Sequence, residues 1–231
     1  MHTLSIDAVI AQRARERRGA DFAFERINCS RTALLAIDAQ NWVMDPESPV
    51  YIPGAETLAP RINAVAQALR TAGGQVIWVQ MEATSAAVAD WPVFYDALVR
   101  ATRGAFIAAM SPGSRWHALY PGLDVHARDL VCRKTRYSCL LQCSSDLDLS
   151  LRNASLDTLL IAGFATNVCC ESTARDAMMM GYKVIMLSDA CGSRSDWEHN
   201  ASLSNLLNMF ADVRDCASAI GLVTASSSGT S

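Results

Sequence analysis

The chain has 231 residues, 51% of them hydrophobic, and a formal net charge of −3. It is long enough for one domain with a full core, and without excess basic residues it is not expected to bind nucleic acid. No apolar run is long enough to span a bilayer, and no apolar signal core opens the chain. We therefore expect a cytoplasmic protein that does not contact membranes.

The two ends of the chain are expected to lie outside the main core. Within the first 29 residues, Ile6, Val9 and Ile10 fall at helical spacing, which predicts an amphipathic helix over 4–18. This leading segment is expected to pack on the domain or on a neighbouring subunit. Residues 222–231 are rich in serine and are expected to form a flexible tail.

Between these ends, over about 30–215, short apolar runs alternate with amphipathic stretches. The expected strands are 32–37, 75–79, 129–132, 159–162 and 183–187, with a short one near 213 and a polar loop at 188–192. The expected helices are 55–72, 147–153, 169–180 and 198–210. This alternation predicts a doubly wound, mostly parallel α/β sheet with helices on both faces, in a single domain over 1–231.

Residues 83–123 follow the second expected strand and show little periodicity. They hold aromatic side chains, among them Trp91, Phe94, Tyr95, Phe106 and Trp116, amid glycine and proline. Such an insertion is expected either to form a lid or pocket wall, or to bury its aromatic rings as ordinary core. Both interpretations stay open.

Eight cysteines invite a disulfide reading, but a domain of this size does not need covalent cross-links. Cys139 and Cys143 stand four apart, yet no second pair accompanies them and the four histidines are scattered. This spacing does not fit structural zinc. We expect free thiols and neither a metal nor another cofactor.

The stretch from 159 to 177 reads as a buried strand, a tight turn and a helix, which places Cys169 in or beside the first helical turn. There the free backbone N–H groups and the helix dipole favour a thiolate, and the same N–H groups suit an oxyanion. Cys169 is therefore a candidate nucleophile. The alternative is an inert buried cysteine, the commoner fate of this residue.

Two further reactive residues follow strands. Asp38 comes directly after the strand 32–37, where partial burial is expected to raise its pKa towards that of a general base. Lys134 belongs to a basic turn after the strand 129–132. Since the carboxyl ends of parallel strands share one edge, Asp38, Lys134 and Cys169 are expected to meet there, a set that suits nucleophilic acyl transfer. A solvated aspartate and a solvated basic turn are the alternatives.

At this point the chain resembles the isochorismatase-like cysteine hydrolases. The resemblance rests on LLAIDAQN at 34–41, KTRYS at 134–138 and GFATNVCCESTARDA at 163–177. It implies a six-stranded sheet, a catalytic triad of Asp38, Lys134 and Cys169, and a cis peptide between Phe164 and Ala165. It also implies that the Ala165 and Cys169 N–H groups form the oxyanion hole.

The resemblance further suggests which reaction to expect. Nicotinamidase-like members bind a metal near the second strand, where this chain reads VQMEA at 79–83 without a histidine. Isochorismate-cleaving members commonly lack the nucleophilic cysteine, which this chain keeps as Cys169. The resemblance therefore implies a cysteine amidohydrolase that cleaves a small amide, carbamoyl or ureido substrate through a thioester. In motif it is most similar to the ureidoacrylate amidohydrolase branch.

Further side chains in the matching motifs are candidates for substrate contact: Gln40, Trp42, Arg136, Tyr137 and Asn167. Trp42 departs from the residues usual in the family and leaves the substrate's identity open. Two other functions remain: a vinyl-ether hydrolase of the isochorismatase type that uses Asp38 and Lys134 without the cysteine, and an idle member that acts as a binding protein. The resemblance and the leading helix favour a homodimer or homotetramer.

Overall fold

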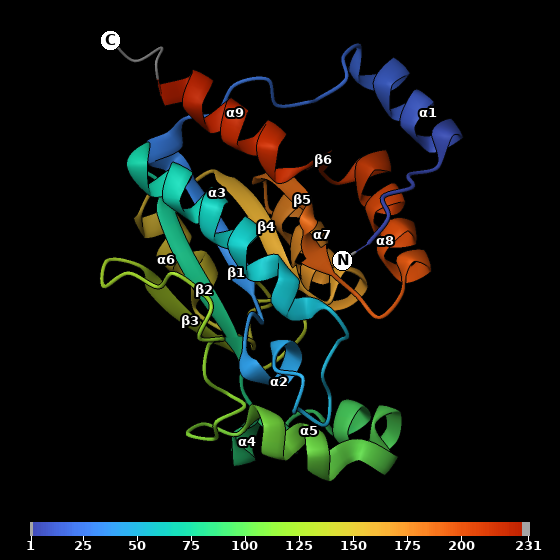
Figure 1. The fold of residues 1–231 in the computed structure, drawn as a ribbon, viewed down its shortest axis with the longest axis vertical. Helices are drawn as coiled ribbons and strands as arrows, with labels where there is room; N and C mark the ends of the chain where they lie inside the picture. Colours follow the sequence, from blue (N-terminus) through green and yellow to red (C-terminus); the bar gives the residue numbers. More distant parts are fainter. Residues whose placement is uncertain (1, 228–231) are drawn as a thin grey trace.

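The computed structural model describes residues 2–227 and is organised around a six-stranded sheet (Figure 1). The strand order is β3-β2-β1-β4-β5-β6, and every neighbouring pair is parallel. The strands are β1 (Thr32–Ile37), β2 (Gln75–Met81), β3 (Leu130–Lys134), β4 (Thr158–Phe164), β5 (Lys183–Gly192) and β6 (Asp212–Arg214). The predicted doubly wound parallel α/β sheet is confirmed.

Helices cover both faces of this sheet. The α-helices are α1 (Ala8–Arg18), α2 (Asn41–Met44), α3 (Ala59–Thr71), α4 (Ser85–Ala89), α5 (Arg103–Met110), α6 (Leu147–Asn153), α7 (Glu171–Met179), α8 (Asp196–Met209) and α9 (Cys216–Ser227). The short 3₁₀ or π turns are η1 (Cys29–Arg31), η2 (Ala55–Leu58), η3 (Val93–Leu98), η4 (Arg100–Thr102) and η5 (Thr166–Cys170). None of the helices within residues 2–227 is long and apolar enough to cross a bilayer.

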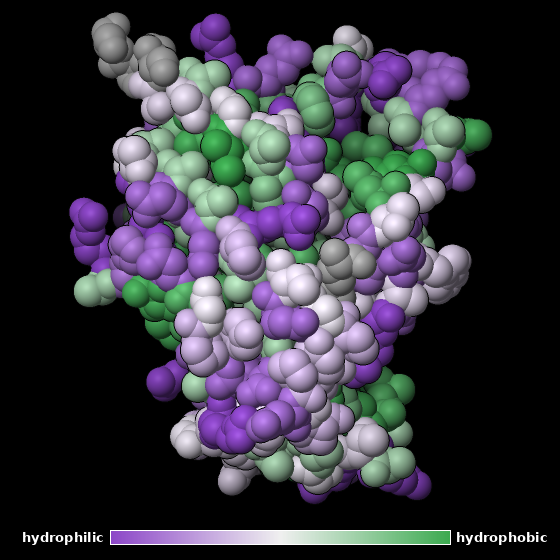
Figure 2. Space-filling model, in the orientation of Figure 1, coloured by the Kyte–Doolittle hydropathy of each residue, from purple (hydrophilic) through white to green (hydrophobic). Residues whose placement is uncertain are grey.

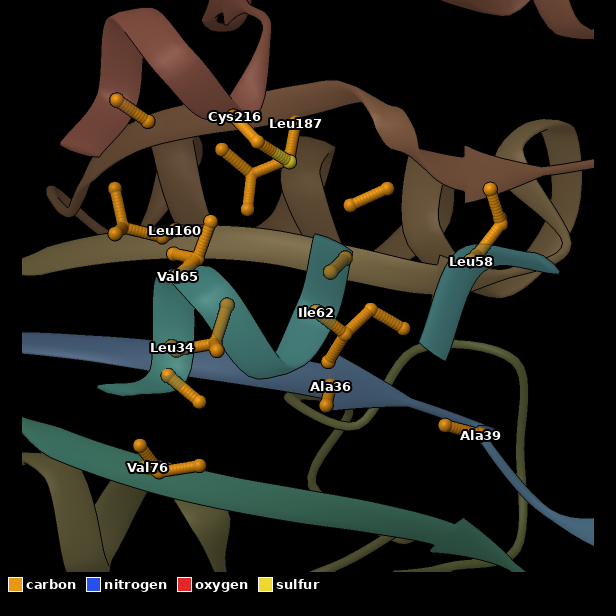
Figure 3. Close-up of a cluster of buried hydrophobic side chains, with 14 of the residues drawn as sticks. Leu34, Ala36, Ala39, Leu58, Ile62, Val65, Val76, Leu160, Leu187 and Cys216 are labelled. Atoms are coloured by element: carbon orange, nitrogen blue, oxygen red, sulfur yellow. The ribbon is translucent and has the colours of Figure 1, made fainter. Parts of the chain in front are cut away.

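The core lies in two layers, one on each face of the sheet. The helices α3 and α9 pack on one face and α6, α7 and α8 on the other. Figure 3 shows Ile62 and Val65 of α3 beside Leu34 of β1 and Leu160 of β4. Strands β1 and β4 are buried along their whole length because both of their faces are covered, which explains their nearly continuous apolar sequences.

A glycine sets the close approach of β1 and β4 where the two strands end. Gly163 pairs with Ile37 and has a positive φ of +114°. A Cβ atom at this position would overlap with the backbone oxygen of Ile37. Only glycine therefore lets the two strands stay paired up to the edge at which Asp38 and Cys169 follow.

The insertion at 83–123 forms α4, η3, η4 and α5 at one end of the molecule (Figure 1). Phe94, Tyr95 and Met110 form a small buried cluster with Met81 of β2. The outer side is apolar too: Val93 and Leu98 are 64% and 71% exposed, and Figure 2 shows hydrophobic surface at this end. Part of the insertion is thus ordinary core, as one of the two interpretations expected.

The leading segment differs from its prediction. The helix α1 begins only at Ala8, because the Asp7 carboxylate caps it by accepting the Ile10 N–H. Ile6 precedes the helix and packs against the core layer that includes α8, whereas Val9 points to solvent with 63% exposure, so the predicted apolar stripe does not form one packed helical face. Residues 2–7 instead run extended along α8, and α1 contacts α8 (Figure 1).

The C-terminal end is more ordered than predicted. The flexible tail expected from 222 is wrong up to 227, because Leu222 and Val223 are buried in α9, which packs against α3. Residues 228–231 lie outside the described part of the chain. The polar loop expected at 188–192 is also wrong: after a register shift opposite β4, β5 continues to Gly192, and Cys191 is buried in the core.

Candidate active site

Three side chains meet at the carboxyl edge of the sheet. Asp38 follows β1, Lys134 is the last residue of β3, and Cys169 lies in the π turn η5 that follows β4. The Lys134 Nζ atom is 2.9 Å from Asp38 Oδ2 and 3.3 Å from Cys169 Sγ. The residues predicted from separate strands are therefore brought together around one ammonium group.

Lys134 reaches this position across the end of β2. Its side chain is fully buried, and Nζ also contacts Met81 Sδ of β2 at 3.4 Å and donates to the Arg136 carbonyl oxygen at 3.2 Å. Burial is the largest influence on Lys134 and lowers its pKa, but the charge and hydrogen bond of Asp38 together with the nearby Cys169 raise it by more in sum, so the pKa of Lys134 lies above its usual value. Lys134 is therefore an ammonium ion at neutral pH.

Asp38 is a buried carboxylate with one oxygen unused. Its Oδ2 atom accepts the Lys134 hydrogen bond, whereas Oδ1 has no hydrogen-bond partner among the described residues. Its backbone is left-handed, with φ of +54°, and its N–H donates to Val79 O at 2.8 Å. Burial raises the pKa of Asp38, and Lys134 offsets part of that rise. The carboxylate thus has both an accessible lone pair and raised basicity.

Cys169 is a thiol rather than a thiolate in this environment. Burial raises the pKa of its thiol, the negative charge of Asp38 raises it further, and Lys134 lowers it by less. This direction is opposite to that expected from the helix terminus, because loss of hydration outweighs the dipole once the sulfur is enclosed. A proton acceptor is therefore needed before the sulfur can attack, and Asp38 Oδ1 is unoccupied.

The segment between β4 and Cys169 turns sharply. The peptide bond between Phe164 and Ala165 is cis, and Ala165 O accepts hydrogen bonds from the N–H groups of Val168 and Cys170. Ala165 and Cys169 both line the cavity described next. This segment, residues 165–169, is called the oxyanion loop below, after the role that the family resemblance predicts for its Ala165 and Cys169 N–H groups.

A cavity of about 200 Å³ opens above Cys169. Apolar and aromatic side chains make most of its wall, and Phe94, Val99 and Phe106 come from the 83–123 insertion. The insertion therefore also serves as a pocket wall, the other interpretation left open. Arg194 is the one charged residue among the described residues that line the cavity.

The predicted substrate contacts divide into two groups. Trp42 and Tyr137 line the cavity. Gln40 does not: its Nε2 donates to the carbonyl oxygens of Met81 and His117, and its Oε1 accepts from the Met81 N–H and the Trp42 indole. The Gln40 side chain therefore makes its hydrogen bonds within the protein rather than to a substrate, and it holds the Trp42 ring in place.

The other two predicted contacts are occupied elsewhere. The Arg136 guanidinium donates to Asp90 O at 3.0 Å and lies 5.1 Å from the centroid of the Trp91 ring. It thus fastens the 83–123 insertion to the end of β3. Asn167 Oδ1 accepts from the Ser193 hydroxyl at 2.6 Å, which ties the oxyanion loop to the segment after β5.

Arg194 is the site residue that the sequence prediction missed. It lies two residues beyond the end of β5, at the same sheet edge as Asp38 and Cys169. The sequence analysis looked for reactive side chains directly after the ends of the expected strands. Arg194 would have been found in this way if β5 had been expected to end at Gly192 rather than at 187. No group of three or more His, Cys, Asp or Glu side chains within residues 2–227 is arranged to hold a metal ion.

A cysteine, a lysine and an aspartate at the carboxyl edge of a parallel α/β sheet define the class as a cysteine hydrolase. Residues 32–218 match the model of the isochorismatase domain, so the chain belongs to the isochorismatase family of hydrolases. A ureidoacrylate amidohydrolase of Methylobacterium radiotolerans is 32% identical over 216 residues, covering 86% of this chain and 83% of that protein.

Two solved structures support the fold. A cysteine hydrolase from Pseudomonas syringae pv. phaseolicola has a TM-score of 0.79 and 26% identity, over 87% of this chain and 95% of that one. An N-carbamoylsarcosine amidase from Thermoplasma acidophilum has a TM-score of 0.65 at 22% identity, over 80% of this chain and 96% of that one, a likeness of fold alone. The predicted membership of the isochorismatase-like cysteine hydrolases is confirmed.

Proposed function

We propose that the protein is an amidohydrolase that cleaves a C–N bond of a small amide, carbamoyl or ureido substrate with Cys169 as nucleophile. The observation that carries this proposal is the buried Lys134 ammonium, 2.9 Å from Asp38 and 3.3 Å from the Cys169 sulfur. The positive charge of Lys134 balances the negative charge of Asp38. The Cys169 thiol must lose its proton before it attacks, and Asp38 Oδ1, which has no hydrogen-bond partner among the described residues, is the proposed acceptor.

In the first half-reaction, Asp38 Oδ1 takes the proton of Cys169 and Lys134 stabilises the thiolate. The sulfur attacks the substrate carbonyl carbon, and the carbonyl electron pair moves to oxygen. The N–H groups of Ala165 and Cys169 are proposed to hold this oxyanion. Collapse of the adduct breaks the C–N bond, and Asp38 returns its proton to the departing ammonia or amine.

In the second half-reaction, water attacks the thioester, which is a thiocarbamate when the substrate carbonyl is ureido. Asp38 accepts a proton from this water and Lys134 keeps the carboxylate in place. The acid product leaves, and the proton held by Asp38 returns to the sulfur of Cys169. No redox step and no external proton source is needed, which fits the balanced charges of the site.

The cavity indicates the substrate class. Its volume of about 200 Å³ is smaller than the roughly 300–1,000 Å³ of pockets for drug-sized ligands. Arg194 lines it, donates to Val50 O at 3.4 Å and pairs with no carboxylate of the described residues. The carboxylate of a small acidic amide would form an ion pair with the Arg194 guanidinium. The similarity to ureidoacrylate amidohydrolases supports the same class.

The cellular setting is proposed from the cysteines and the resemblance. All eight cysteines are free, which suits the reducing cytoplasm. We also propose a homodimer or homotetramer. Sedimentation of the purified protein tests the oligomer, and a mass equal to one chain would overturn it.

Ammonia release from a panel of primary amides, carbamoyl amino acids and ureido acids tests the reaction, with wild type compared to Cys169→Ala. Release by the wild type alone supports the cysteine amidohydrolase. Pyruvate formed from isochorismate equally by both proteins, with no ammonia from the panel, would overturn it in favour of vinyl-ether hydrolysis by Asp38 and Lys134.

A further inference from the structure

Residues 2–7, called the N-terminal strap below, are fastened to the side of α8. The Ser5 N–H donates to Asn200 Oδ1 at 2.8 Å, and Asn200 Nδ2 donates back to Thr3 O at 2.9 Å. The Asp7 N–H reaches the hydroxyl of Ser204 at 3.3 Å. These contacts run along one helix and carry the start of the chain to the beginning of α8, next to Arg194.

His2 ends the strap with a fixed tautomer. Its Nε2 atom accepts the backbone N–H of Ser193 at 2.9 Å, so this nitrogen is unprotonated. The proton therefore lies on Nδ1, which is 2.7 Å from Asp196 Oδ1 and donates to it. The His2 side chain is only 7% exposed. Such burial and pairing indicate a built contact.

The first connection from His2 leads to the cavity cation. Ser193, whose N–H is held by His2, directly precedes Arg194. The Ser193 hydroxyl donates to Asn167 of the oxyanion loop at 2.6 Å. The segment that contains Ser193 and Arg194 thus places Arg194 at the cavity, and His2 fixes the backbone of this segment through the N–H of Ser193.

The second connection leads to the oxyanion loop itself. The His2 ring stacks on that of His199, with centroids 4.4 Å apart and planes inclined by 18°. His199 is fully buried, and its Nδ1 lies 2.9 Å from the hydroxyl of Thr166, the residue after Ala165. Packing on His199 therefore restrains the Thr166 side chain and the turn that holds Ala165.

We propose that His2 is a positioning residue of the active site, with two separable effects. Its hydrogen bond to Ser193 fixes Arg194 and so favours binding of a carboxylate-bearing substrate. Its stacking on His199 fixes Thr166 and so favours the turnover step. The substrate-binding half of this inference rests on the function proposed above, whereas the positioning of Arg194 and of the oxyanion loop does not.

Three variants of the full chain separate the two effects. His2→Phe keeps a ring to stack but loses the acceptor for Ser193, and should raise KM about fivefold with kcat within about twofold, the effect of one hydrogen bond. His2→Gln offers an acceptor to Ser193 without a ring, and should lower kcat about fivefold with KM nearly unchanged. His2→Ala should change both constants.

A second readout does not need the amide reaction. Iodoacetate and iodoacetamide alkylate the same sulfur but differ in charge, so the ratio of their rates at Cys169, measured on its peptide by mass spectrometry, reports the nearby Arg194 cation. The ratio should fall in His2→Phe and His2→Ala, as in Arg194→Gln, and stay near the wild-type value in His2→Gln. If the chain cleaves no amide, this ratio alone decides the inference.

The matched control is His126→Ala, which removes another histidine paired with an aspartate, Asp124 at 3.1 Å, in a loop that does not line the cavity. It should leave both kinetic constants and the alkylation ratio unchanged. Equal changes in all three His2 variants, or changes in melting temperature alone, would make His2 a merely structural residue and overturn the inference. An unchanged alkylation ratio in His2→Ala would do the same.

Discussion

Two buried carboxylates lie at opposite ends of the sheet and differ in the number of hydrogen bonds that they accept. This number distinguishes a carboxylate that stabilises the fold from one that can take up a proton. Asp129, before the start of β3, accepts from Arg70, from the Trp78 indole and from the His126 N–H. Asp38, after the end of β1, accepts from Lys134 through Oδ2, and its Oδ1 has no hydrogen-bond partner within residues 2–227. Burial raises both pKa values, but the many donors lower that of Asp129 overall, whereas that of Asp38 stays raised. A carboxylate left partly unpaired keeps the ability to take a proton.

The largest expected effect comes from removing the base. Asp38→Asn keeps the shape but cannot accept the thiol proton, so kcat should fall by about 10²–10⁴. Asp129→Asn, the matched change in the fully paired carboxylate, should leave kcat within about twofold. Steady-state ammonia release measures both. Turnover by Asp38→Asn above a tenth of wild type would contradict the assignment of the base.

Asp129→Ala should instead affect stability. The change leaves the buried Arg70 guanidinium and the Trp78 N–H without their acceptor, at a cost of about 3 kcal/mol of unfolding free energy. For a chain of this length the melting temperature should fall by roughly 6–12 °C. Thermal unfolding followed by circular dichroism checks this. A shift below about 2 °C would mean that the Asp129 network contributes little.

Two arginines extend the same comparison. Arg70 is neutralised by Asp129 and Asp124, whereas Arg194 has no carboxylate partner among the described residues. Arg194→Gln should therefore raise KM for carboxylate-bearing amides about tenfold, the worth of one charged hydrogen bond, and leave neutral amides unaffected. Parallel kinetics on one acidic and one neutral amide measure the difference. An equal rise for both would remove Arg194 from substrate recognition.

A buried histidine gives the smallest expected effect. Burial lowers the pKa of His199 to about 4, below the value of about 6.5 expected in the unfolded chain. Between these values the unfolded state binds more protons, so His199 destabilises the fold as pH falls. From pH 7 to pH 5 its contribution should be a loss of about 2 kcal/mol. Denaturant unfolding of wild type and His199→Asn at both pH values isolates it, and equal pH dependence would refute it.

The parts of the fold that could be predicted from the sequence are those that local residues decide. The apolar residues of β1 and β4 must be buried on both faces, so β1 was predicted with its observed bounds, which places Asp38 directly after it, and β4 was predicted two residues short of its end at Phe164. The end of β5 was missed because a register shift carries the strand past Ser188 and Asp189, and Arg194 was missed with it. Side-chain hydrogen bonds such as those of Gln40 are made to backbone groups distant in the sequence, which no local sequence pattern reveals.

The role of Cys169 as a covalent nucleophile can be measured directly. The enzyme is mixed with an amide that it hydrolyses and is quenched in acid during turnover. The Cys169 peptide should then carry the acyl group, and mass spectrometry should show it heavier by the mass of the substrate minus that of the leaving ammonia or amine. Cys169→Ala should show neither the adduct nor turnover. Undiminished turnover by Cys169→Ala, with no adduct on the wild type, would contradict the account.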